Sequence, residues 1–301
     1  MKRYHFYQLD VFTRQPFGGN QLAVFIDGRG LETAQMQALA REMNYSETTF
    51  VLPPETTGAQ KKVRIFTPAI EMPMAGHPTV GTSAALVHLG MVEPDGHTLV
   101  LDLGIGPVRV DYESRETGLP YVWMNHRLPE FGPTRTDRER VAAALGLEES
   151  DLRTDLPMQI VSTGVPFLFI PITSLDAIGR AQSEAGALAR LFVDESPIML
   201  ALFTEEVMRT EARFHNRMFA PHVASIVEDP ATGSMAAPFG AYTARHGLLP
   251  DEPQCTFLIE QGLEMGRPSQ INVSVSREVG QITGLRIGGD SVLVGEGDIF
   301  W

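Results

Sequence analysis

The sequence contains an internal repeat that relates its two halves. Residues 77–85 read HPTVGTSAA and residues 229–237 read DPATGSMAA, and the two stretches align without a gap. The offset from 77 to 229 is 152 positions, half of the 301-residue chain. A duplication is the simplest origin, so we expect two similar halves, each with a turn that leads into a helix. His77 and Asp229 share one aligned position, which predicts a proton-transfer enzyme with its active site between the halves.

Length and charge narrow the class of protein. A chain of 301 residues is long enough for two domains that each bury a core. The hydrophobic fraction of 43% and the charged fraction of 20% are typical of a globular protein. The net charge of −13 argues against nucleic-acid binding, which needs a basic surface to neutralise phosphates. An anionic substrate would need local positive potential from arginine, protonated histidine or helix N-termini.

Several common chemistries have no signature in the sequence. Cys255 is the single cysteine, so an intramolecular disulfide and a thiol metal site are both excluded. The histidines lack metal-ligand spacing, and the GxGxxG, GxxxxGK[ST], HExxH and GxSxG motifs are absent. No apolar run suits a secretory signal or spans a bilayer, the stretch 164–172 being too short. We expect a cytoplasmic enzyme that uses acid/base residues without metal or cofactor.

Hydrophobic periodicity predicts an α+β fold. Met36, Leu39, Ala40 and Met43 follow helical spacing and predict an amphipathic helix over 32–43. Residues 82–92 are apolar on nearly every side, so the helix that they predict has to be enclosed by sheet. Strand patterns outnumber helices and do not alternate with them, which disfavours a doubly wound parallel fold. We therefore predict two mixed sheets or barrels, each wrapped around a central buried helix.

The domain boundary is predicted from turn residues. The stretch 125–136 contains Pro129, Gly132 and Pro133 and has little periodicity, so it is the best candidate for a linker. We predict a first half over 1–125 and a second half over 126–301, with the last strand able to pack back on the first half.

The two repeated turns could bind an anion. Gly81 and Gly233 stand just before the predicted helices and allow backbone N–H groups to approach a ligand. Thr82 and Ser234 are suitable N-cap or first-turn hydroxyls, and Pro238 places the second helix start close to Ser234. Plain capping is the preferred explanation for either turn alone, whereas the matched pair favours function.

The candidate acid/base residues each have a structural alternative. His77 has an ordinary pKa suited to proton transfer, yet a lone histidine is more often structural. Asp229 precedes a proline and could simply form a turn. Glu47 lies in NYSETTF beside several hydroxyls, where it could act as a general acid/base or face solvent. Asn20 is best explained as a turn residue, and Arg267 as part of a turn near the cleft.

Five motifs resemble those of the phenazine-biosynthesis PhzF family. They are FTRQPFGGNQLAVF, NYSETTFVL, MAGHPTVGTSAAL, EDPATGSMAAPFGAY and EQGLEMGRPSQI, and the match continues to the final VGEG. The resemblance implies a diaminopimelate epimerase-like fold of two pseudo-symmetric halves, with the active site between them. It also places the family's glutamate on Glu47, its glycine–histidine pair on Gly76 and His77, its aspartate on Asp229 and its serine on Ser234. The activity that it implies is isomerisation of trans-2,3-dihydro-3-hydroxyanthranilate by a proton shift, without metal or organic cofactor, in a homodimer.

The resulting hypothesis is a cofactor-independent isomerase of a small carboxylated substrate. Glu47, His77 and Asp229 are the predicted catalytic residues, Glu47 moving the proton with a carboxyl pKa raised by burial. The predicted substrate-binding residues are Asn20, Gly76, Gly233 and Ser234. An amino-acid epimerase or racemase on the same fold is one alternative, although the lone Cys255 excludes a two-thiol mechanism. A non-catalytic binding protein is the other.

Overall fold

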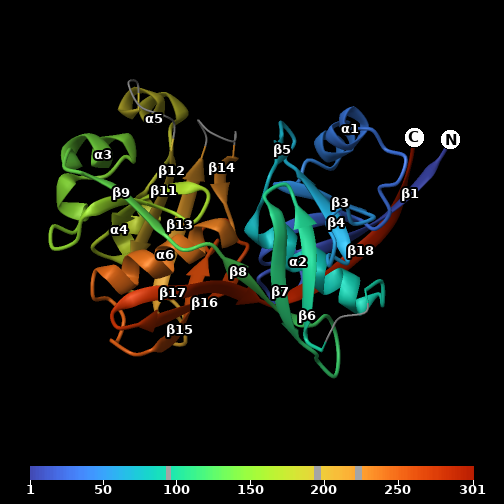
Figure 1. The fold of residues 1–301 in the computed structure, drawn as a ribbon. Coiled ribbons are helices and arrows are strands. Elements are labelled where there is room, and N and C mark those ends of the chain that lie inside the picture. Colours follow the sequence, from blue (N-terminus) through green and yellow to red (C-terminus); the bar gives the residue numbers. More distant parts are fainter. Residues whose placement is uncertain (93–95, 193–197, 221–225) are drawn as a thin grey trace. The chain divides into compact units, whose positions relative to one another are not determined.

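The computed structural model describes residues 1–92, 96–192, 198–220 and 226–301 (Figure 1). The chain forms two compact units, one of residues 1–125 and 287–301 and the other of residues 126–286. Unit 1 thus ends its first segment at Asn125, where we place the end of the first half. The predicted α+β class is confirmed, since strands dominate both units.

Unit 1 is a mixed sheet with two helices. Its elements are β1 (Arg3–Val11), β2 (Asn20–Phe25), α1 (Thr33–Met43), β3 (Glu47–Leu52), β4 (Lys61–Phe66), β5 (Glu71–Met72), α2 (Gly76–His88), β6 (Thr98–Leu103), β7 (Gly106–Glu113), β8 (Tyr121–His126) and β18 (Ser291–Phe300). The strand β18 pairs antiparallel with β1 and so returns the end of the chain to this unit.

Unit 2 contains the remaining elements. They are β9 (Glu130–Arg135), α3 (Arg138–Ala144), the 3₁₀-helix η1 (Glu149–Asp151), β10 (Met158–Ser162), β11 (Pro166–Pro171), α4 (Leu175–Arg180), α5 (Ala185–Leu191), β12 (Met199–Thr204), β13 (Phe214–Ala220), β14 (Ile226–Asp229), α6 (Gly233–Arg245), β15 (Gln254–Gln261), β16 (Ser269–Glu278) and β17 (Gln281–Gly289). The predicted linker 125–136 is therefore partly a strand, because β9 pairs antiparallel with β10.

Strand pairing reveals the duplication directly. In unit 1 the order β1-β2-β3-β4-β6-β7 alternates antiparallel and parallel pairs, beginning with an antiparallel pair. In unit 2 the order β10-β11-β12-β13-β15-β16 has the same alternation. A short strand pairs with the fourth of each series, β5 with β4 and β14 with β13, and leads to α2 or α6. The two halves thus share one topology.

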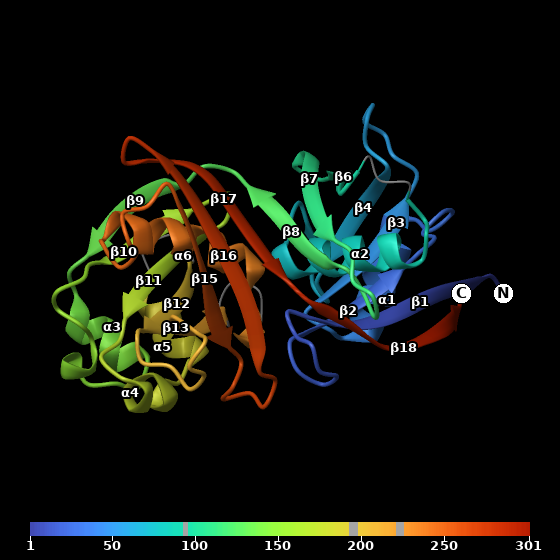
Figure 2. The same ribbon diagram turned by 90° about the horizontal axis from the view of Figure 1, so that it is seen from below.

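The helix after each short strand is enclosed by its own unit. In α2, residues 76–86 are all buried, as we predict for a helix without a polar face. Figure 1 shows the strands of unit 1 around α2, and Figure 2 shows α6 among β10, β11, β15 and β16. At Gly81 an added Cβ would lie 2.6 Å from Val11 Cγ2, and at Gly240 the same distance from Val273 Cγ1. These two glycines let the helices approach the sheets closely.

The start of α2 differs from the predicted one, whereas the start of α6 lies close to its predicted position. The helix α2 begins at Gly76, so HPTVG is its beginning and not a turn before it. Thr82 is consequently inside α2, where its buried hydroxyl lies 2.9 Å from that of Thr49. The helix α6 begins at Gly233, close to the predicted start, with Thr232 as its N-cap residue. Pro238 is the sixth residue of α6 and so lies beyond the first turn, in which we predict it.

Candidate active site

Three predicted residues of unit 1 come together at the start of their elements. Asn20 is the first residue of β2, Glu47 the first of β3, and His77 the second of α2. The parallel pairing of β2 with β3 places Glu47 opposite Leu22, so both strands begin on the same side. His77 Nε2 lies 3.3 Å from Glu47 Oε2, with side chains 4% and 13% exposed. Glu47 thus lies largely buried beside His77, whereas the alternative left open by the sequence is a glutamate that faces solvent.

Hydrogen bonds fix the tautomer of His77. Ser46 donates its hydroxyl proton to Asn20 Oδ1 over 2.7 Å, which turns the amide nitrogen of Asn20 toward His77. That nitrogen lies 3.1 Å from His77 Nδ1 and donates to it. A ring nitrogen that accepts a hydrogen bond carries no proton, so the proton of the neutral ring is on Nε2. Nε2 therefore carries the N–H and lies 3.3 Å from Glu47 Oε2, without the geometry of a hydrogen bond to it.

The imidazole of His77 is neutral at physiological pH. Burial lowers its pKa from 6.5 to about 3, and a hydrogen bond with the backbone of Gln21 opposes this shift only partly. The N-terminus of α2 acts in the same direction as burial, because the positive end of the helix dipole disfavours a cation. A neutral donor next to a carboxylate can stabilise its charged form. His77 is thus suited to donate a hydrogen bond and unsuited to store a proton.

Asn20 and Gly76 are both buried next to His77, and Asn20 also forms a hydrogen bond with it. Asn20 is 1% exposed and connects Ser46 to His77, so its turn-forming role is not its main one. Gly76 is the first residue of α2 and is buried. Ser46 was not among the predicted residues, although the hydroxyls beside Glu47 pointed to this stretch.

In unit 2 the predicted residues lie at the start of α6. Asp229 is the last residue of β14 and is 6% exposed. Thr232 donates its hydroxyl proton to Asp229 Oδ2 over 2.5 Å. Gly233 and Ser234 are the first two residues of α6, and Ser234 is half-buried. Asp229 ends β14 and Pro230 begins the bend that leads to α6, so this segment presents a carboxylate and a helix N-terminus.

The N-terminus of α6 has the properties of an anion site. In the described part of the chain, the backbone N–H groups of Gly233 and Ser234 and the Ser234 hydroxyl make no hydrogen bond. Donors at a helix N-terminus and its dipole both favour a negatively charged ligand. This arrangement could hold a substrate carboxylate without a basic side chain. Whether the residues of unit 1 and unit 2 serve one active site stays a prediction.

The turn before α6 is held by a residue that the sequence did not single out. Gln261, at the end of β15, is fully buried and forms hydrogen bonds with Asp229 and Thr232. The motif EQGLEMGRPSQI contained Gln261, but only Arg267 was considered there. Arg267 closes a turn by donating its backbone N–H to the carbonyl of Gly262.

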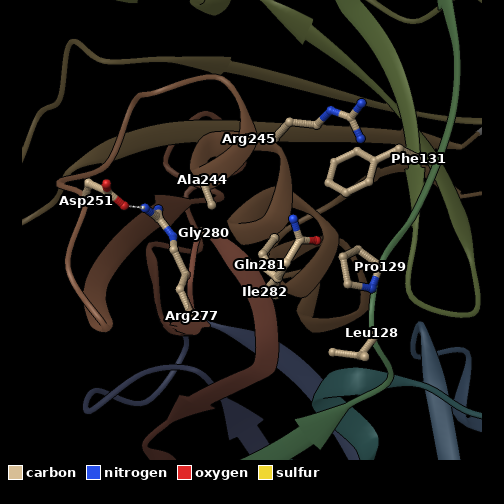
Figure 3. Close-up of a pocket in the computed structure, with 10 residues that line it drawn as sticks. All are labelled: Leu128, Pro129, Phe131, Ala244, Arg245, Asp251, Arg277, Gly280, Gln281 and Ile282. Carbon is tan, nitrogen blue, oxygen red and sulfur yellow. Dashed lines mark hydrogen bonds and ion pairs between the residues drawn. The ribbon is translucent and has the colours of Figure 1, made fainter.

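A cavity elsewhere in unit 2 has a different lining. Its volume is about 630 Å³, and Figure 3 shows its ten lining residues. Arg245 lies over the ring of Phe131, 4.2 Å from the centroid, and Arg277 Nη1 is 3.4 Å from Asp251 Oδ1. None of the predicted site residues lines it.

The described residues contain neither a cluster of metal ligands nor a helix long and apolar enough to cross a membrane. Over the described ranges, no group of three or more histidine, cysteine or acidic residues could hold a metal ion. Within the same ranges, every helix is too short or too polar to span a bilayer. Cys255 is half-buried in β15, outside both repeated segments.

Comparisons with known proteins agree on one family. The model of the phenazine biosynthesis-like proteins, PhzC-PhzF, matches residues 9–297. An uncharacterised isomerase of Mesorhizobium japonicum is 41% identical, with 97% of each chain covered. The trans-2,3-dihydro-3-hydroxyanthranilate isomerase of Pseudomonas chlororaphis is 34% identical over 98% of this chain and 99% of its own. The crystal structure of a PhzF-family protein from Bacillus anthracis superposes with a TM-score of 0.92 at 28% identity and covers 100% of both chains.

Proposed function

The chain belongs to the phenazine biosynthesis-like (PhzC-PhzF) family and is an isomerase, and from this premise we propose that it shifts a proton on a small cyclic carboxylate. The proposed substrate class is that of trans-2,3-dihydro-3-hydroxyanthranilate, the substrate in the name of the Pseudomonas chlororaphis relative. The observation that carries the proposal is the buried contact between His77 Nε2 and Glu47 Oε2 at 3.3 Å. No cofactor is part of the mechanism that we propose.

Glu47 is the proposed proton carrier. Its carboxylate takes a proton from one carbon of the substrate and becomes a carboxylic acid, while the electron pair of the broken C–H bond moves into the conjugated system. The carboxylic acid then returns a proton to a second carbon, which regenerates the carboxylate. One such general acid/base group contributes about 10²–10⁴-fold to the rate.

His77 assists Glu47 without carrying the proton itself. Its pKa of about 3 makes the neutral ring a poor base at pH 7. His77 Nε2 lies 3.3 Å from Glu47 Oε2, and a hydrogen bond formed between them during the reaction would be strongest when the carboxylate is ionised. His77 therefore stabilises the basic form of Glu47 and keeps its second oxygen oriented for the substrate.

Asp229 and the N-terminus of α6 have binding roles in the proposal. The Gly233 and Ser234 N–H groups and the Ser234 hydroxyl donate hydrogen bonds to the substrate carboxylate, because all three are donors without a partner in the described residues. Asp229 orients a polar group of the substrate and balances charge that develops during the shift. The homodimer implied by the family resemblance is a further part of the proposal, which light scattering would test.

The Glu47→Gln variant tests the proposal. Wild-type protein is incubated with trans-2,3-dihydro-3-hydroxyanthranilate in D₂O, and product and deuterium content are followed by NMR. We expect turnover to fall by about 10²–10⁴-fold in Glu47→Gln, with substrate binding nearly unchanged. The matched control is Glu55→Gln, because Glu55 follows β3 closely in the chain and its side chain is 71% exposed. This control should turn over like wild type.

The outcomes separate the candidate functions. Wild-type turnover in Glu47→Gln would remove Glu47 from its role. If wild type leaves this substrate unchanged but incorporates deuterium at the α-carbon of an amino acid, the protein is an epimerase and the proposed reaction is wrong.

A further inference from the structure

The side chain of Gln261 docks the turn that carries Asp229. Its Nε2 donates to the Asp229 carbonyl over 2.7 Å and to Thr232 Oγ1 over 3.0 Å, and its Oε1 accepts the Thr232 N–H over 3.2 Å. Ser269 Oγ adds contacts of 2.8 Å to the Pro230 carbonyl and 2.9 Å to the Gln261 carbonyl. A buried amide with this many partners is strongly specified, since each bond that is lost leaves a desolvated polar group.

The order of donors and acceptors in these hydrogen bonds is fixed, and the last acceptor is the carboxylate of Asp229. The amide oxygen of Gln261 accepts from Thr232 N–H, so its nitrogen must be the donor to Thr232 Oγ1. Thr232 Oγ1 accepts this hydrogen bond from Gln261 and donates its own hydroxyl proton in a hydrogen bond to Asp229 Oδ2, over 2.5 Å. Each donor thus polarises the next, and the chain favours the ionised form of Asp229.

A charged group anchors the strand that carries Gln261. His215 is fully buried, and its Nδ1 and Nε2 each lie 2.9 Å from a carboxylate oxygen, of Glu260 and Glu264 respectively. Glu260 also accepts the backbone N–H groups of Met208 and Arg209, over 2.6 and 2.9 Å. Glu260, next to Gln261 on β15, therefore joins three segments of unit 2, namely β15, β13 and residues 208–209.

The turn also approaches the end of β15 closely at Gly262. Gly262 follows Gln261 with φ +76°, and an added Cβ would lie 2.5 Å from the carbonyl oxygens of Pro230 and Arg267. Successive side chains of a strand point to opposite faces, so Glu260 is held by His215 on one face while Gln261 reaches the turn on the other.

We propose that Gln261 and Thr232 are positioning residues that orient the Asp229 carboxylate, and that His215, held between Glu260 and Glu264, keeps β15 in the register that this requires. The proposal rests on the proposed function only in that Asp229 acts on the substrate. A purely structural role for the same bonds predicts loss of stability alone. A positioning role predicts, in addition, a change at the Asp229 carboxylate and in kcat.

The test compares two nearly isosteric substitutions at Thr232. Thr232→Val keeps the shape and removes the hydroxyl, whereas Thr232→Ser keeps the hydroxyl. With trans-2,3-dihydro-3-hydroxyanthranilate as the probe, we expect kcat to fall about tenfold or more in Thr232→Val with little change in KM, and to stay near wild type in Thr232→Ser. Gln261→Leu should behave like Thr232→Val. Gln270→Leu is the matched control, because Gln270 lies on the paired strand β16 and is opposite Glu260.

A second readout does not need turnover. A ¹³C NMR titration of the Asp229 carboxyl should show it titrating at higher pH in Thr232→Val and Gln261→Leu than in wild type, Thr232→Ser and Gln270→Leu. If wild type fails to convert the probe, the proposed function fails, and this titration still tests the positioning role. Identical titration of Asp229 in Thr232→Val and Thr232→Ser would overturn the proposal, as would equal kcat in the two variants.

Discussion

His77 in unit 1 and His215 in unit 2 are both buried, yet they have opposite charge states. Burial lowers the pKa of His77 to about 3, and the ring accepts a hydrogen bond at Nδ1. Burial also opposes the charge on His215, but hydrogen bonds and attraction from Glu260 and Glu264 raise its pKa to about 9. The partners of both ring nitrogens, and not burial alone, decide the charge. The neutral histidine suits chemistry beside Glu47, whereas the charged one suits a scaffold.

The largest expected effect is the loss of stability when His215 is removed. His215→Leu leaves two carboxylates in place without their shared cation, and breaking a buried ion pair in this way costs about 3–5 kcal/mol. Urea denaturation at pH 7 measures it. His88→Asn, at the exposed end of α2, is the control and should stay within about 0.5 kcal/mol of wild type. A loss below about 1 kcal/mol would mean that His215 is not charged.

The two histidines should give opposite dependence of stability on pH. The folded pKa of His215 is above the ordinary 6.5, so its contribution is complete below pH 6.5 and is lost as pH rises through about 9. Its size is on the order of 3 kcal/mol. The folded pKa of His77 is below 6.5, so its contribution is present above pH 6.5 and is lost as pH falls toward 3. Unfolding free energies from pH 4 to 10 should show a flatter alkaline side in His215→Gln and a flatter acid side in His77→Asn.

Substitution of His77 should affect catalysis more than stability at pH 7. His77→Gln removes the imidazole whose Nε2 lies beside Glu47, and we expect kcat to fall about 10–100-fold with KM nearly unchanged. Steady-state kinetics with trans-2,3-dihydro-3-hydroxyanthranilate measures both constants. Unchanged kcat in His77→Gln would place His77 among the scaffold residues with His215.

The smallest effect is expected at Ser234. Ser234→Ala removes one donor from the N-terminus of α6 and leaves its backbone N–H groups, so KM should rise about tenfold while kcat changes little. The same kinetic assay measures it, with Ser276→Ala on β16 as the control. A fall in kcat without a change in KM would assign the hydroxyl to the reaction and not to binding.

The repeat and the hydrophobic patterns predicted much of the fold. Helical spacing predicted a helix over 32–43, and α1 covers Thr33–Met43. The absence of a polar face predicted that α2 is enclosed. The predicted start of α2 was wrong because Pro78 and Gly81 are residues typical of turns. Proline is tolerated in a first helical turn, and Gly81 is required by close packing on Val11 and Leu22.

The site could be predicted only in part. The family motifs supplied Glu47, His77, Asp229 and Ser234 by position, and the structure places the first two in contact. The role of Ser46 could be inferred from the sequence, since Ser46 directly precedes Glu47. The role of Gln261 could not be inferred, because Gln261 lies on β15, about 30 positions after the Asp229 turn that it contacts. The charge of His215 was equally hidden, since it depends on two glutamates that the fold brings to one ring.

The division between a working histidine and a scaffold histidine can be measured directly. Long-range ¹H–¹⁵N NMR of the imidazole rings at pH 7 reports which ring nitrogens carry protons. We expect His77 to be neutral with its proton on Nε2, and His215 to be protonated on both nitrogens. A charged His77, or a His77 ring with its proton on Nδ1, would contradict the account, because Nε2 could then not act as the neutral donor to Glu47.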